Sequence, residues 1–441
     1  MPTTKPVVCL SITTALALST LSPSLYAQSE IFDGQSGTIS EIGDVVQIAL
    51  PAGALIGSLW IGDTEGAWQL TKGVAATAAI THTMKFGYER LRPDGSESNS
   101  FPSGHTSAAF SGAAYIHHRY GNAWGIPAYA AATFVGASRV WANRHYVDDV
   151  LAGGSIAVLS SLYFTDPYNN SALVVVPSFG EDHIGLAMSY TPGLKGPKGN
   201  KSNQNAEIWG EKKQTLLHSY SLLVGGFDTE KNQINEVGQD SFDLYDFSRE
   251  SEPNTYAAAQ LRWGLDESQY LSFGFVPMEA RDTTILKQDT NFGGKSYHAG
   301  SEVVSAYRNW MLSTDYVYKL LTDSDWVLDV GAGVSIIGQS IRLDNINGEN
   351  LSEHDDLFIT PAASIEAGYH FTESLSTTIG YRISGLSDFD QESLWLSINY
   401  QLNDRWATSL FAGQINQTTD TNDYYNDAEF DYGGFAVTYA F

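Results

Sequence analysis

The hydrophobic pattern of the chain changes once, at the polar stretch TDPYNNSA from Thr165 to Ala172. Before this stretch, long apolar segments rich in Ala and Gly alternate with polar turns, as the helices of a bundle do. After it, aromatic and aliphatic residues alternate with polar residues in runs of about ten, the pattern of a strand with two different faces. The sequence therefore predicts a multidomain α + β protein, with an N-terminal all-α helical bundle and a C-terminal antiparallel β-barrel.

Five segments of the N-terminal part have the length and spacing of helices: Ile39–Trp60, Gly66–Phe86, Ser103–Tyr120, Trp124–Ala142 and Tyr146–Tyr163. Ser103 is a suitable N-cap for the third segment, and Pro127 lies near the start of the fourth. Some segments approach the length of a transmembrane helix, but most carry charges or many small residues. We expect a soluble or membrane-surface helical domain at residues 28–164, followed by a linker at 165–172.

The C-terminal part has clear strand patterns, among them HIGLAMSY, QYLSFGFVPM and SLWLSINYQL. About 270 residues follow the linker, and a spanning strand with its share of turn and loop uses on the order of 20 to 25 residues. The length predicts a transmembrane barrel of about twelve strands at residues 173–441, with ten or fourteen also acceptable. The final segment FAVTYAF resembles the C-terminal signal of bacterial outer-membrane barrels. A soluble all-β sandwich or lipocalin-like barrel is the alternative.

Residues 1–27 have the pattern of a secretory signal peptide. Lys5 supplies the positive start, an apolar run follows, and Leu25-Tyr26-Ala27 offers a small residue before the cleavage point. The only cysteine of the chain is Cys9, so the mature protein is expected to have no disulfide and no thiol chemistry.

Three short blocks stand out inside the helical part: KFGYERLRP at 85–93, PSGH at 102–105 and SRVWANRHYVDD at 138–149. Most of the scarce cations between residues 28 and 168 lie in or beside these blocks, namely Lys85, Arg90, Arg92, Arg139 and Arg144. A domain that keeps its few cations near two histidines is suited to a compact polyanion, and phosphate is the simplest candidate.

The blocks contain the groups that bind a phosphate. A helix that begins around Ser103 would point free N–H groups outward, and Gly104 lets the backbone approach closely. Arg92 and Arg139 offer planar forks for phosphoryl oxygens, and Lys85 adds a point charge.

The same blocks contain the groups that could transfer a phosphate. His145 and Asp149 are four residues apart, so a helix would place the carboxylate where it can fix the imidazole tautomer of a nucleophile. His105 could protonate the leaving oxygen. We interpret His117 and His118 as structural. Because no carboxylate cluster has the spacing of metal ligands, we expect transfer without a metal or other cofactor.

The pattern K-x6-RP, PSGH, SR-x5-H-x3-D is similar to the signature of type 2 phosphatidic acid phosphatases, whose superfamily includes bacterial class A acid phosphatases and vanadium haloperoxidases. The resemblance covers about 38–164 and implies that phosphate is bound by Lys85, Arg92, Ser103, Gly104 and Arg139. It further implies that His105 is the general acid, His145 the phosphorylated nucleophile and Asp149 its partner.

Taken together, these features predict a metal-independent phosphatase that is tethered to the outer membrane and forms a phosphohistidine. Its substrate could be phosphatidic acid, an isoprenoid diphosphate, a lipid A phosphate or a soluble phosphoester. With an even number of strands and Phe441 at the periplasmic end, the first barrel strand would also start in the periplasm. A linker of ~8 residues reaches at most ~28 Å, so we expect the phosphatase domain beside that end of the barrel, in the periplasm. The net charge of −26 disfavours nucleic acid as a partner. The partners that we expect are the phosphorylated substrate and the lipids of the outer membrane.

Three other interpretations stay open. The same cations could hold vanadate in a haloperoxidase. The chain could also be a porin or adhesin whose helical domain is only a periplasmic plug, and the helical domain could be an inactive relic that has kept its residues. The sequence does not settle whether the barrel is an anchor, a pore or a second enzyme.

Overall fold

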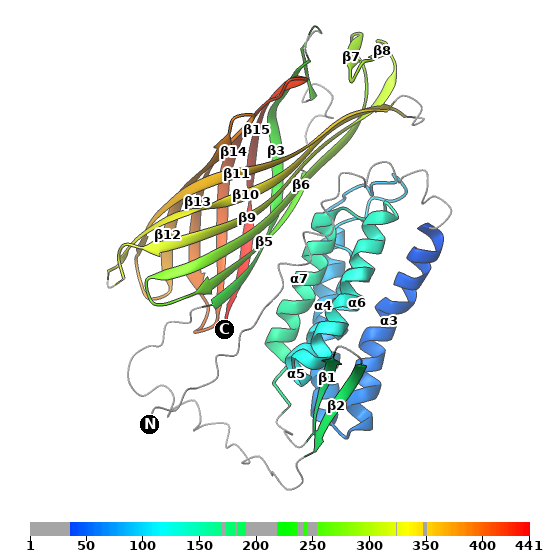
Figure 1. Ribbon diagram of the computed structural model, residues 1–441, viewed down its shortest axis with the longest axis vertical. Helices are drawn as coiled ribbons and strands as arrows, with labels where there is room; N and C mark the ends of the chain where they lie inside the picture. The colour runs from blue at the N-terminus through cyan, green and yellow to red at the C-terminus, as the bar shows by residue number, and fades with distance from the viewer. Residues whose placement is uncertain are drawn as a thin grey trace.

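A bundle of helices lies against the outer wall of a closed β-barrel in the computed structural model (Figure 1). The structure describes residues 36–168, 173–180, 183–190, 218–236, 238, 241–244, 254–322, 324–346 and 351–441. The predicted signal peptide therefore lies outside the described residues, as does the second half of the predicted linker.

The bundle consists of α3 (Ser36–Trp60), α4 (Thr64–Gly87), α5 (Gly104–Tyr120), α6 (Asn122–Trp141) and α7 (Val147–Phe164). Each predicted helix is present, with bounds shifted by three residues or fewer. Small side chains pack between α5 and α6, including Ala109, Ala113 and Ala132, which are fully buried. At Gly112 of α5, an added Cβ would lie 2.5 Å from the backbone N of Pro51 in α3. The small residues thus permit the close helix approach that brings the site together.

Two helices, Gly37–Trp60 and Val147–Phe164, are long and apolar enough to cross a membrane, judged by length and composition among the described residues. The first is mostly uncovered and exposes Val45, Ile48 and Ile56. The second is largely buried because it packs against the barrel. A soluble or membrane-surface bundle stays a prediction.

The barrel is closed by ten antiparallel strands, and the pairing of β15 with β3 completes the circle. The ten strands are β3 (His218–Glu236), β5 (Asn254–Gly264), β6 (Gln269–Ile285), β9 (Glu302–Lys319), β10 (Trp326–Asn345), β11 (Ser352–His370), β12 (Leu375–Leu386), β13 (Phe389–Gln401), β14 (Trp406–Asp420) and β15 (Tyr424–Ala440). A short β4 (Phe242–Asp243) extends the sheet beside β3, and β7 (Thr290–Phe292) pairs with β8 (Lys295–Tyr297) in a loop.

The prediction of about twelve strands is wrong in number. It counted strands from residue 173, but β1 (Leu173–Gly180) and β2 (His183–Tyr190) pair only with each other among the described strands. The barrel begins at His218, so about 220 residues form ten strands and use ~22 residues each, as expected. About fifty residues therefore separate the bundle from the first barrel strand, where we had expected a linker of eight.

The inside of the barrel is polar and filled. Gln339 of β10 donates to Asn426 of β15 (2.9 Å) and accepts from Thr419 of β14 (2.8 Å). Gln417 of β14 donates to the hydroxyl of Tyr307 in β9 (3.1 Å). Because these strands are not neighbours in the sheet, the contacts cross the lumen.

The outside of the barrel is apolar, with Ile359, Ile379, Leu396, Ile398 and Leu410 among its exposed side chains. This inside-out pattern is typical of a membrane barrel and not of a soluble sandwich. The connections at 265–268, 371–374 and 402–405 lie at one end, which we call the short-turn end. The strand ends joined by the two longest connections, 237–253 and 286–301, lie at the opposite end, which we call the long-loop end.

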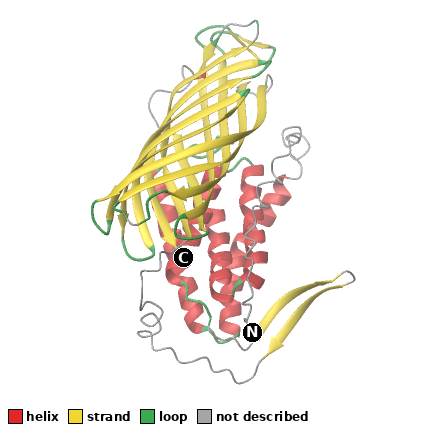
Figure 2. Cartoon of the chain, turned by 60° about the vertical axis from the view of Figure 1, so that its left-hand side comes forward, coloured by secondary structure: helices red, strands yellow, loops and turns green. Residues whose placement is uncertain are grey.

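The helical bundle lies beside the barrel wall (Figure 2), and helix α7 packs along that wall. Its apolar side chains, for example Ile156 and Leu159, form one buried cluster with Leu222 and Val224 of β3. Tyr163, near the end of α7, contacts Trp406 at the short-turn end, with ring centroids 5.9 Å apart. The N-terminus of α7 therefore points toward the long-loop end, and the predicted site lies toward that end as well.

Candidate active site

The three sequence blocks meet at one pole of the bundle. The last turn of α4 carries Lys85, the start of α5 carries Gly104, the last turn of α6 carries Arg139, and the first turn of α7 carries Asp149. His145 lies in the short connection between α6 and α7. Because neighbouring helices run in opposite directions, ends that are far apart in sequence share this pole.

The start of α5 is arranged as the PSGH block predicts. Ser103 is the N-cap, and its Oγ accepts a hydrogen bond from the backbone N–H of Thr106 (3.4 Å). The backbone N–H of Ser103 donates to the backbone carbonyl of Asp149 (2.9 Å), which ties α5 to α7. A Cβ added at Gly104 would lie 3.8 Å from Cε of Lys85. The lysine therefore lies over a helix N-terminus, where both groups attract an anion.

His145 and Asp149 form the expected pair. Nδ1 of His145 lies 3.3 Å from Oδ2 of Asp149, so Nε2 faces away from the carboxylate. The same Oδ2 accepts the backbone N–H of Tyr146 (2.8 Å) and the hydroxyl of Ser100. Burial lowers the pKa of His145, with Lys85 and Arg92 acting in the same direction and Asp149 opposing them. A neutral imidazole with a free Nε2 lone pair is the form that a nucleophile requires.

Arg139 and His105 lie together, joined by a carboxylate that the sequence did not single out. Nη1 of Arg139 donates to Oδ1 of Asp44 (2.7 Å), and Nε2 of His105 lies 3.1 Å from the same oxygen. Burial and the charge of Arg139 lower the pKa of His105 to about 4. Asp44 is the one charged residue in the apolar stretch GDVVQIAL, and that isolation is the signal that could have identified it.

Lys85 and Arg92 are held by the loop between α4 and α5. Arg92 donates through Nε and Nη2 to Oδ1 of Asn99 (3.2 and 2.9 Å), and its Nη2 lies 3.1 Å from Glu97. Nζ of Lys85 donates to the backbone carbonyl of Asn99 (2.5 Å). Burial lowers the pKa of Lys85 to about 8. Both cations lie close enough to His145 to lower its pKa, while their hydrogen bonds run to their own loop.

Arg90 has a position that the sequence did not predict. Its Nη1 donates to Asp148 (2.7 Å) and Asp149 (3.1 Å), and its Nη2 donates to the backbone carbonyl of Glu279 in β6 (3.2 Å). The guanidinium also stacks on Tyr146, 3.8 Å from the ring centroid. Arg90 thus connects the partner carboxylate of His145 to the barrel wall.

His117 and His118 lie near the end of α5 that is opposite to Ser103. His118 Nδ1 lies 2.8 Å from the hydroxyl of Ser161, and His117 Nε2 lies 2.8 Å from Oδ1 of Asn122. Structural roles for both stay a prediction. Among the described residues there is no group of three or more His, Cys, Asp or Glu side chains arranged to hold a metal ion.

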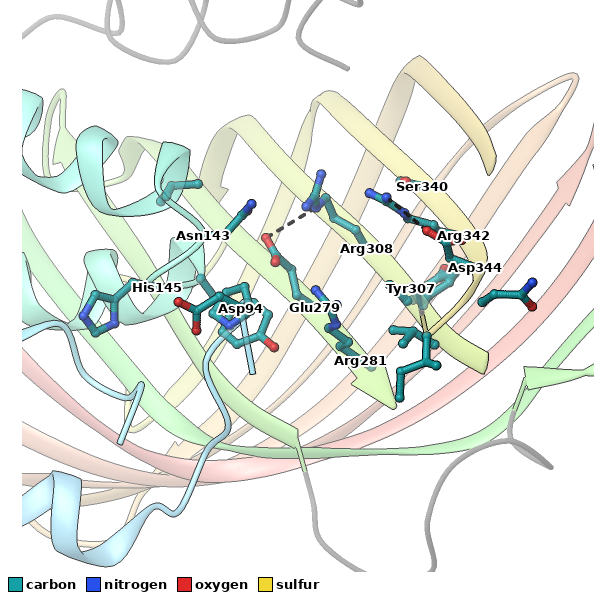
Figure 3. Close-up of a pocket in the computed structure, with 18 residues that line it drawn as sticks. Asp94, Asn143, His145, Glu279, Arg281, Tyr307, Arg308, Ser340, Arg342 and Asp344 are labelled. Carbon is teal, nitrogen blue, oxygen red and sulfur yellow. Dashed lines mark ion pairs between the residues drawn. The ribbon is translucent and has the colours of Figure 1, made fainter. Parts of the chain in front are cut away.

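A cavity of about 380 Å³ lies between the site and the barrel. His145, Asn143 and Asp94 line it from the bundle (Figure 3), and β6, β9 and β10 supply the opposite wall. His145 therefore lies at the edge of a space that the barrel helps to enclose.

Comparisons with known proteins agree with this geometry. Residues 66–171 match the PAP2 superfamily. A lipid A 4'-phosphatase of Helicobacter pylori is 30% identical over 169 residues, which cover 36% of this chain and 85% of that protein. A lipid A 1-phosphatase of Porphyromonas gingivalis is 39% identical over 106 residues, which cover 22% of this chain and 24% of that protein.

Among solved structures, the outer membrane protease OmpT of Escherichia coli superposes with a TM-score of 0.35 and 9% identity, covering 53% of this chain and 99% of that one. The matched blocks, the bundle that unites them and the Helicobacter relative, aligned over most of its length, lead to one conclusion: this chain belongs to the PAP2 superfamily.

Proposed function

We propose that the protein is a metal-independent phosphatase that removes phosphate from lipids through a phosphohistidine at His145, and that its barrel holds it in the outer membrane. One observation carries this proposal. A buried imidazole has one nitrogen held by a carboxylate and the other without a hydrogen bond to the described residues, at the pole where the predicted phosphate ligands gather. A structural histidine would have no need of surrounding cations.

The first step would be attack by Nε2 of His145 on phosphorus. A P–N bond forms, the P–O ester bond breaks, and the leaving oxygen takes a proton from Nε2 of His105. Arg92, Arg139 and Lys85 would stabilise the charge on the phosphoryl oxygens. Burial and Arg139 lower the pKa of His105. A phosphate dianion bound next to it would raise that pKa, so that the imidazole takes up from solvent the proton that it then donates.

The second step would release the phosphate. Neutral His105 accepts a proton from a water molecule, and the resulting oxygen attacks phosphorus. The P–N bond then breaks, which leaves inorganic phosphate and the starting imidazole. Asp149 holds the ring in one tautomer through both steps, because its Oδ2 is itself fixed by Tyr146 and Ser100.

A phosphorylated lipid is the substrate class with the best support. The names of two relatives specify lipid A phosphates, and the barrel keeps the chain at a membrane. Phosphatidic acid, isoprenoid diphosphates and lipid A phosphates all present the same phosphate group. A periplasmic location for the phosphatase domain stays a prediction.

The decisive test is phosphate release by the refolded full chain from lipid phosphates and from p-nitrophenyl phosphate. His145→Ala should lower kcat by about 10³-fold or more, since it removes the nucleophile. His117→Ala is the matched control, because that histidine bonds Asn122 away from the site, and it should stay active. Unchanged release by His145→Ala would refute the proposal. Strict dependence on an added metal would count against the histidine mechanism.

A further inference from the structure

The cavity beside His145 has two unlike walls. The bundle wall carries His145, Asn143 and Asp94, and the barrel wall carries Arg281, Arg308 and Arg342. His145 lies at one end of the cavity, and Arg342 lies at the other (Figure 3). Its volume of about 380 Å³ falls in the range of sites that bind a small ligand or a headgroup. The barrel is therefore part of the space that a substrate would occupy.

The pairing register of the strands gives the position of this cavity along the barrel axis. Glu279 of β6 pairs with Arg308 of β9, which pairs with Ser340 of β10, which pairs with Asp355 of β11. On β11, the next outward residues toward the short-turn end are Leu357 and Ile359, and both are exposed. The cavity thus lies directly beyond the apolar band, on the side of the long-loop end.

The loop lengths indicate which side of the membrane that is. In outer-membrane barrels the short turns are periplasmic and the long loops are extracellular. The bundle runs along the wall from Tyr163, beside the short-turn residue Trp406, up to Arg90, beside Glu279. The catalytic pole therefore lies at the level of the outer-leaflet headgroups.

The barrel wall of the cavity is suited to a polar headgroup. Nε of Arg308 lies 3.5 Å from Oε1 of Glu279, and Nη2 of Arg342 lies 3.9 Å from Oδ2 of Asp344. Arg281 is exposed and makes no hydrogen bond or ion pair with the described residues. Charged side chains on the outer face of a membrane barrel are costly unless headgroups or water solvate them. A row of such residues marks a place where headgroups belong.

We propose that the active site opens onto the outer leaflet of the outer membrane and that the barrel wall forms the second side of the substrate site. The substrate is then a phosphorylated lipid of that leaflet, whose headgroup lies against Arg281, Arg308 and Arg342 while its phosphate lies at His145. This inference rests on the proposed phosphatase activity for its chemistry. It replaces the periplasmic location that we predicted from the linker.

Site-directed labelling tests the sidedness. In a Cys9→Ser background, Ser96→Cys places a thiol on the exposed loop beside the site. A maleimide on a polyethylene glycol too large for porins should modify it in intact cells. Asp388→Cys, at the long-loop end, should be modified equally, and Asp404→Cys, at the short-turn end, only after the membrane is permeabilised. If Ser96→Cys behaves like Asp404→Cys, the inference is overturned.

Wall variants test the second half of the site. Arg281→Gln and Arg342→Gln should each lower kcat/KM for a lipid phosphate in mixed micelles by about tenfold, and leave hydrolysis of p-nitrophenyl phosphate unchanged. That soluble activity also shows that each variant has folded. Arg405→Gln, a barrel arginine outside the cavity, is the control and should affect neither substrate. Equal effects on both substrates, or no effect on either, would overturn the role of the wall.

Two further experiments distinguish a lipid headgroup from a free anion at the wall, and a failure of the proposed function from a failure of the present inference. Free inorganic phosphate should not restore lipid hydrolysis to the wall variants, because they have lost contacts to a headgroup; restoration would mean that the wall binds a free anion. If His145→Ala remains active, the proposed function itself fails. If His145→Ala is inactive but the labelling reports a periplasmic site, only the present inference fails.

Discussion

The carboxylate of Asp44 occupies an unusual place for a residue of α3. It lies between Arg139 and His105, the two groups that a phosphoryl oxygen would have to reach. A carboxylate and a phosphate carry charge of the same sign, so they compete for the same guanidinium. Asp44 accepts a hydrogen bond from the buried Arg139 and lies 3.1 Å from Nε2 of His105.

We expect Asp44→Asn to lower the KM for a soluble phosphomonoester by about 3- to 10-fold, because a like charge is removed from the phosphate site. Steady-state kinetics and inhibition by inorganic phosphate would measure this. Asp166→Asn, at the opposite pole of the bundle, is the control. A higher KM for Asp44→Asn would mean that the carboxylate orients Arg139 for substrate and does not compete with it.

The pH dependence of kcat/KM should reflect His145 and Lys85. Burial lowers the pKa of His145, so the reactive neutral form persists below pH ~6.5 and the acid limb should lie below that value. Lys85, with a pKa of about 8, loses its charge above that pH, and phosphate binding should weaken. Lys85→Arg keeps its charge, so its alkaline limb should move upward while the acid limb stays. An unmoved alkaline limb would exclude Lys85 as its origin.

For single residues, the sequence predicted the contacts between residues of the three blocks. It did not predict the contacts that other elements make with these residues. The spacing from His145 to Asp149 is local, and helix geometry alone brings the two together. Asp44 arrives from α3, and the Glu279 carbonyl that meets Arg90 arrives from β6. Such contacts depend on how whole elements pack, which local spacing does not contain.

Among the elements, α7 has two tasks. Its first turn carries Asp149, and its later turns pack against the barrel. Between them lies Gly153, where an added Cβ would lie 2.5 Å from the backbone oxygen of Ser103. The close approach of α7 to α5 at this glycine therefore sets the distance between the His145 pair and the helix start.

Gly153→Ala should force α7 away from α5 and lower kcat by about 10- to 100-fold, with a loss of roughly 1–3 kcal/mol in the free energy of unfolding. Phosphate release and thermal unfolding would measure the two effects. Gly154→Ala is a matched control, because its Cβ would lie 3.4 Å from the ring of Phe110, an ordinary contact. Similar behaviour of the two variants would show that the approach at Gly153 is not what positions the site.

The elements also show why helices were predicted better than strands. A cap such as Ser103 and a positive-φ residue such as Gly121 mark helix ends locally. Alternation in a strand reports only that its two faces differ. The segment HIGLAMSY in β2 alternates like a barrel strand, yet it pairs only with β1 among the described strands. Whether a strand belongs to a sheet depends on which strands it pairs with, and alternation does not show this. The number of barrel strands was therefore predicted too high.

For the whole molecule, a filled lumen argues against a general pore. Side chains from opposite walls hydrogen-bond across the interior at Gln339, Gln417 and Tyr307, and Arg382 bonds Asp315 further toward the short-turn end. Barrels of this size hold side chains and not a channel. The sequence could not reveal this, because alternation gives the polarity of the lumen and not its width.

We therefore expect the purified protein to give no stable open-channel conductance in planar bilayers, while a porin in the same bilayer serves as the positive control. Substituting the residues that cross the lumen, for example Gln339→Ala with Gln417→Ala, should raise leakage if the hydrogen-bonded side chains block it. A large stable conductance from the unmodified protein would support the porin interpretation instead.

The bond from Arg90 to the Glu279 carbonyl has a consequence for biogenesis. The guanidinium holds Asp148 and Asp149 on one side and a strand of the barrel on the other. A chain still in transit has no closed barrel to accept that bond, so its histidine pair lacks its final support. We expect the enzyme to acquire full activity only on arrival, which would protect the phospholipids that it meets along the way.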